Sequence, residues 1–172
     1  MTLRLRGSDL IHLDEGTYMW IQVTHFAIEA EQSDRSLLSS LIASPGYAHD
    51  YASPFDPDEE VQQSAVHGRW RLETIHPALF ARCTPHDAEA LLQVWVDEQQ
   101  WTEPGYRQPP KVRARVEGVV NLLRSGRLYR LNNPGTDAEH EYGFATGSLG
   151  FHEFVVIDRV TECLLLVVAS DD

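Results

Sequence analysis

The run from residue 151 to residue 170, FHEFVVIDRVTECLLLVVAS, limits the possible folds more than any other part of the sequence. Two apolar runs of strand length are separated by the polar residues 159–162, which is the size of a short hairpin loop. Every position from 164 to 169 is apolar, so both faces of this second strand must be covered. The pattern predicts a C-terminal hairpin at the centre of a sheet.

Further strands are predicted in the first half of the chain. Leu3 and Leu5 alternate with arginines, which indicates a short strand that ends at Gly7. Residues 18–31 are rich in β-branched and aromatic side chains, which favours a strand. Their apolar spacing also fits a helix, and the end of this segment has helical character, so the alternative stays open. Residues 66–76 predict another strand, which Pro77 ends.

Two helices are predicted in the middle of the chain, at about residues 85–100 and 110–125. The first has Thr84 as its N-cap, and both carry an apolar stripe along one side. A shorter helix is predicted to begin at the N-cap Ser33 and to end before Pro45.

Strands and helices occur in separate blocks rather than in alternation, which favours an α+β fold. We expect a single domain over residues 1–172, built on a mainly antiparallel sheet. The hairpin 151–170 is expected at the centre of this sheet, with the two middle helices packed on one face. A long loop is expected at about residues 45–60, where three prolines interrupt any regular pattern.

Composition excludes several classes of protein. The chain has 14 Lys and Arg against 26 Asp and Glu, and this net charge of -12 argues against nucleic-acid binding. Cys83 and Cys163 are far apart and form no CxxC motif, so neither a disulfide framework nor a zinc site is expected. The sequence shows no signal-peptide pattern and no long apolar run, so we expect no membrane association and a cytoplasmic location.

The loop at residues 45–60 combines aromatic and acidic side chains. Aromatic residues can anchor an interface, and carboxylates can steer a basic partner toward it. Our first hypothesis is a small acidic binding protein of the inhibitor type, immunity- or antitoxin-like, that covers a basic protein partner. The structural alternative is an ordered surface loop that packs its own side chains. The predicted partner-binding residues are Tyr47, Tyr51, Phe55, Asp56, Asp58, Glu59 and Glu60.

The alternative hypothesis is a small enzyme that acts on a low-molecular-weight substrate in a pocket between sheet and helices. No common catalytic or phosphate-binding motif is present, so the sequence does not decide whether the chain is an enzyme. His152 and Glu153 are the catalytic candidates, because a desolvated carboxylate on a strand can act as a general acid. Pairing with an arginine, or a position at the rim of the sheet, is the structural explanation for Glu153.

A metal site is a further possibility, although the sequence predicts no cofactor. His140-Glu141 and His152-Glu153 bracket a glycine-rich link that could bring the two dipeptides together. His140, His152 and Glu153 are therefore candidate ligands for zinc or iron. A purely structural subunit of an oligomer is a third possibility, and the oligomeric state is not indicated by the sequence.

Overall fold

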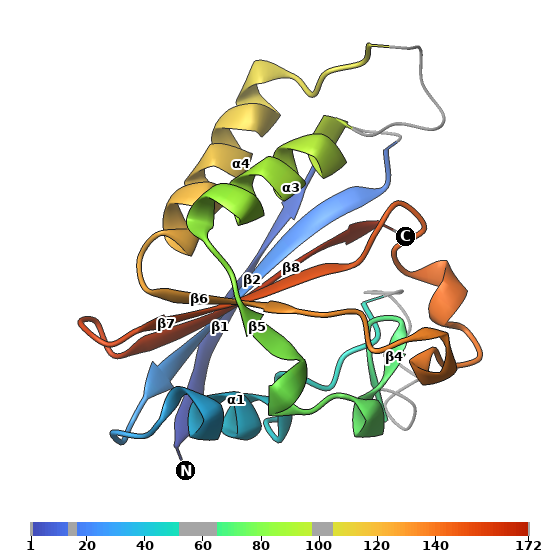
Figure 1. The fold of residues 1–172 in the computed structure, drawn as a ribbon. Coiled ribbons are helices and arrows are strands. Elements are labelled where there is room, and N and C mark those ends of the chain that lie inside the picture. Colours follow the sequence, from blue (N-terminus) through green and yellow to red (C-terminus); the bar gives the residue numbers. More distant parts are fainter. Residues whose placement is uncertain (1, 14–16, 52–64, 98–104, 172) are drawn as a thin grey trace.

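A six-stranded antiparallel sheet runs through the centre of the computed structural model, which describes residues 2–13, 17–51, 65–97 and 105–171 (Figure 1). The strand order is β1-β2-β8-β7-β6-β5. As predicted, the C-terminal hairpin is central, because β8 lies between β2 and β7, and all residues from 164 to 169 are buried. The strands of this sheet are β1 (Leu3–His12), β2 (Met19–Ile28), β5 (Phe80–Arg82), β6 (Arg127–Leu131), β7 (His152–Asp158) and β8 (Cys163–Asp171).

Helices cover both faces of the sheet (Figure 1). The two middle helices, α3 (Pro85–Asp97) and α4 (Pro110–Leu123), pack together on one face, as predicted. Helix α1 (Asp34–Ile42) and the segments after it cover the other face. The fold is therefore α+β, in a single compact domain. Short 3-10 turns complete the described elements: η2 (Leu72–Thr74), η3 (Pro77–Leu79), η4 (Thr136–Ala138) and η5 (Gly143–Ala145).

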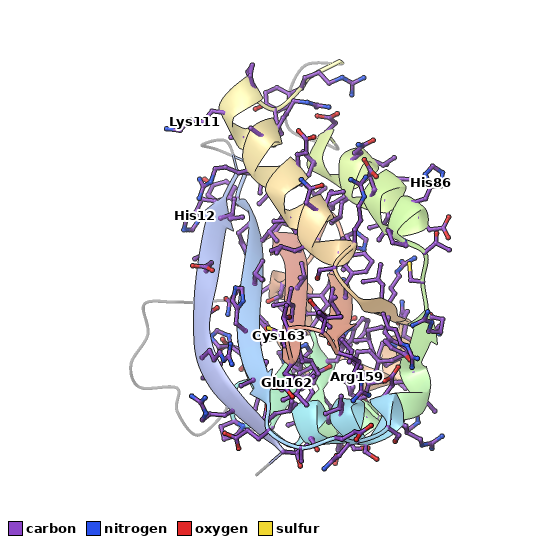
Figure 2. All side chains as sticks on the ribbon, turned by 90° about the vertical axis from the view of Figure 1, so that its left-hand side faces the viewer. His12, His86, Lys111, Arg159, Glu162 and Cys163 are labelled. Carbon is purple, nitrogen blue, oxygen red and sulfur yellow. The ribbon has the colours of Figure 1, made fainter. Side chains whose placement is uncertain are left out.

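Successive side chains of β8 point to opposite faces of the sheet, and this alternation divides the core into two clusters. Leu165 and Val167 face α3 and α4, where they pack with Trp95 and Leu123. Leu164 and Leu166 point the opposite way, toward α1. Figure 2 shows side chains filling the space between the sheet and the helices, while the labelled His86 and Lys111 point outward from α3 and α4.

The predicted helix starts are confirmed by their capping hydrogen bonds. The backbone N–H of Ser36 donates to Ser33 Oγ over 3.2 Å at the start of α1. At the start of α3, the backbone N–H of Asp87 donates to Thr84 Oγ1 over 3.1 Å.

Three strand predictions need correction or refinement. β1 continues past Gly7 to His12, because a bulge between Leu5 and Gly7 absorbs the change in register. β2 confirms the strand interpretation for residues 19–28, and the predicted continuation into a helix is wrong, because residues 29–33 are neither strand nor helix. Residues 66–76 are not one strand. They form the short hairpin of β3 (Val66–His67) and β4 (Trp70–Arg71), followed by the 3-10 turn η2.

No helix within the described residues combines the length and apolar character needed to cross a membrane.

Candidate functional site: a buried network at the base of an acidic segment

Tyr47, His67 and Glu153 form a hydrogen-bonded network inside the protein, and none of the three residues is more than 1% exposed. The Tyr47 hydroxyl donates to Glu153 Oε1 over 2.8 Å. The second carboxylate oxygen, Glu153 Oε2, lies 2.8 Å from His67 Nε2. His67 Nδ1 lies 2.5 Å from the carbonyl oxygen of Tyr47. The network therefore closes on itself, and both oxygens of the carboxylate have a partner.

The hydrogen-bond partners fix one proton of this network. The carbonyl oxygen of Tyr47 can only accept a hydrogen bond, so His67 Nδ1 donates to it. The other ring nitrogen, His67 Nε2, shares a hydrogen bond with Glu153 Oε2. Burial removes water from these polar groups, and their mutual hydrogen bonds offset that cost.

Aromatic rings surround the network and separate it from water. The Tyr47 ring is stacked on His67, with ring centroids 3.7 Å apart and planes 3° from parallel. Tyr51 and Phe151 meet the same imidazole edge-on, at centroid distances of 5.4 and 5.8 Å. A substrate therefore has no direct access to Glu153 or His67 in this structure.

Burial also controls the ionisation of both tyrosines. The pKa values of Tyr47 and Tyr51 are raised well above 10, first by burial and then by the nearby charge of Glu153. Tyr47 thus stays protonated at neutral pH and keeps its role as hydrogen-bond donor.

The network ties together the two ends of the acidic segment at residues 52–64. His49 N–H donates to the carbonyl of Val66 over 3.1 Å, and Gly68 N–H donates to the carbonyl of His49 over 2.7 Å. These bonds hold the residues before and after the segment side by side. The hydrogen bond between the His67 ring and the backbone carbonyl of Tyr47 joins the same two stretches. The base of the segment is thus built from described, mostly buried residues.

The predicted partner-binding residues fall into two groups. Tyr47 and Tyr51 are 0% and 5% exposed, so they belong to the buried base of the segment rather than to a surface where a partner could contact them. The remaining members lie outside the described residues: Phe55, Asp56, Asp58, Glu59 and Glu60.

The predicted catalytic and metal residues are not brought together. Neighbouring strand residues point to opposite faces of the sheet. Glu153 contacts Tyr47, whereas the His152 ring faces Trp95 of α3, with the two ring centroids 6.1 Å apart. His140 is engaged elsewhere, with Nε2 lying 2.8 Å from the carbonyl oxygen of Gly68. Within the part of the chain that the structure describes, no three His, Cys, Asp or Glu side chains lie close enough to hold a metal ion.

His67 is the site residue that sequence reasoning missed. It was assigned to an ordinary strand, and the expected counter-charge of Glu153 was an arginine. The available signal was Glu153 itself, because a carboxylate on an otherwise apolar strand face needs a buried donor.

A scan against protein-family models and searches of curated proteins and of solved structures found no match.

Acidification is expected to destabilise the protein through His152. Burial, helped by the positive charge of Arg130, lowers the pKa of His152 to about 4 from 6.5. The unfolded chain takes up this proton near pH 6.5, whereas the folded protein takes it up only near pH 4. The stabilisation is therefore complete above pH 6.5 and is lost as the pH falls toward 4.

Urea denaturation at pH 7.0 and pH 4.5 measures this effect. We expect His152→Gln to lose less stability than the wild type between the two pH values, since glutamine takes up no proton. His86→Gln, at an exposed position on α3, is the control and should follow the wild type. Equal losses in wild type and His152→Gln would show that another group carries the pH dependence.

Proposed function

We propose that this protein binds a basic protein partner through its acidic segment and acts as a small inhibitor-type binding protein. The observation that carries the proposal is the buried network of Tyr47, His67 and Glu153, which fixes both ends of this segment. A binding segment with a fixed base loses less conformational entropy on association than a free one. Binding residues are commonly carried on loops that a rigid scaffold positions.

The distribution of charge supports a basic partner. Residues 45–67 contain five acids and no Lys or Arg. Four of these acids stand within five residues, at positions 56–60. Such a concentration accelerates encounter with a basic surface and weakens as salt is added.

Neutralising the acids of the segment tests the proposal. The test variant carries Asp56→Asn, Asp58→Asn, Glu59→Gln and Glu60→Gln. A control with the same change in charge carries Glu31→Gln, Glu117→Gln, Glu141→Gln and Glu162→Gln, all at exposed positions. Each immobilised protein is used to capture interacting proteins, which are identified by quantitative mass spectrometry, and the captured partner is then titrated by calorimetry at low and high salt.

We expect the wild type and the control to bind the same basic protein, and the test variant to bind it about 100-fold more weakly, since several close charge pairs are lost. The salt dependence of binding should also fall in the test variant. Equal affinity of the test and control variants, or a captured partner that is not basic, would overturn the proposal.

A further inference from the structure

A second feature is a pocket of about 290 Å³ where β6 ends and β7 begins. Arg69 and Trp70 of the β3–β4 hairpin form part of its wall, with Arg130 from the end of β6 and His152 from the start of β7. The volume is at the lower end of the range for ligand sites, so it suits a small molecule.

The walls of this pocket carry positive charge in a protein whose net charge is -12. Arg69 Nη2 forms an ion pair with Glu139 Oε2 over 3.2 Å. The guanidinium carbon of Arg69 lies 5.2 Å from the centroid of the Trp70 ring. Arg130 makes no ion pair with any residue that the structure describes, although its guanidinium is close enough to His152 to help lower the pKa of that ring. One unbalanced cation therefore lines the pocket.

The pocket residues also carry polar atoms that the chain leaves without a partner. Arg69 Nε and His152 Nδ1 are both buried, and neither has a hydrogen-bond partner among the described residues. Asn132 and Asn133 line the same pocket. Buried polar groups are almost always satisfied in a folded protein, so these two atoms are open to a partner such as a bound ligand or a water molecule.

We propose that this pocket binds a small anion that bears a carboxylate or phosphate group on a flat apolar body. Arg130 and the asparagine amides contact the anionic group, because arginine offers a fork of donors that matches both kinds of oxyanion. The apolar body lies against Phe151 and Trp70, which line the same pocket. The pocket adjoins the buried network through Phe151, but the inference does not depend on the partner proposed above.

Titration of the ¹⁵N-labelled full chain, followed by NMR at constant ionic strength and pH 7, tests the inference. The probes are benzoate, phenyl phosphate and uncharged benzamide. Arg130→Gln removes the unpaired cation of the pocket. Arg82→Gln is the matched control, because Arg82 lies on the neighbouring strand β5 and stacks over Tyr129, outside the pocket.

We expect both anions to give saturable shifts at the amides of Asn132, Asn133 and Gly150, and benzamide to bind far more weakly. Arg130→Gln should weaken anion binding about tenfold, the effect of losing one charge-assisted contact, while Arg82→Gln should not. The tighter of the two anions identifies the group as carboxylate or phosphate. Absence of saturable shifts, equal binding of benzamide, or equal effects of the two arginine variants would overturn the inference.

The His152 ring gives an independent readout. Arg130 on β6 is the charged group that acts on this ring, Arg69 and Glu139 line the same pocket, and the Trp95 ring of α3 lies with its centroid 6.1 Å from that of His152. A bound anion stabilises the protonated ring, so the pKa of His152 should rise from about 4 when either anion is present. An unchanged titration of His152 at saturating anion would place the anion elsewhere and count against the proposal.

Discussion

Replacing Glu153 by leucine is expected to lower the free energy of unfolding by about 3 to 5 kcal/mol, because two buried polar groups lose their hydrogen-bond partner at once. The variant leaves His67 Nε2 and the Tyr47 hydroxyl without that partner, in a site that is closed to water. Urea denaturation at pH 7 measures the loss. Glu153→Gln keeps the shape of the side chain and one acceptor oxygen, so its loss should be smaller.

A triple variant distinguishes loss of the hydrogen-bonded network from loss of packing. This variant removes every polar side-chain group of the network, and it combines Tyr47→Phe, His67→Leu and Glu153→Leu. Replacing all partners of a buried polar network by apolar groups is often neutral or even favourable, so the triple variant should be more stable than Glu153→Leu alone. A loss below about 1 kcal/mol for Glu153→Leu, or a triple variant that is less stable still, would show that the network is not a coupled unit.

Gly68→Ala is expected to lower the free energy of unfolding by about 2 to 4 kcal/mol, through left-handed backbone strain and overpacking together. Gly68 has a φ of +54°, and a Cβ atom there would lie 2.2 Å from the ring of Phe151. Phe151 packs against His67, so it has little freedom to move away.

Gly118→Ala is the matched control for this substitution. Gly118 lies within helix α4, and a Cβ atom there has no neighbour within 4 Å. Alanine is favoured over glycine inside a helix, so this variant should gain about 0.5 to 1 kcal/mol. Thermal and urea denaturation of both variants give the comparison, and a Gly68→Ala protein as stable as the wild type would contradict the assigned backbone constraint.

The parts of the fold that the sequence predicted are those with a local cause. The run of apolar residues in β8 requires cover on both faces, which only a central strand has. Ser33 and Thr84 mark helix starts because their side chains can cap the first turn. The hairpin at residues 66–71 was missed because a single left-handed glycine, Gly68, turns a chain that otherwise has strand composition.

The candidate site was only partly predictable because its contacts are not local. Glu153 lies 106 residues from Tyr47 and 86 from His67, and no spacing rule connects such positions. The sequence identified Glu153, Tyr47 and Tyr51 as notable, but it placed them in separate hypotheses. The sheet and the turn at Gly68 bring these residues together, and that arrangement is a property of the tertiary fold.

The position of β8 also affects how the molecule forms during synthesis. β1 and β2 are made first, yet β2 has no hydrogen-bonded neighbour on its inner edge until residues 163–171 have been made. A nascent chain that stops before this point keeps the inner edge of β2 and the apolar side chains around it exposed to water. Such intermediates aggregate readily and are bound by chaperones. Shortening the chain by its last strand should therefore prevent assembly of the whole sheet, rather than merely trim one end of it.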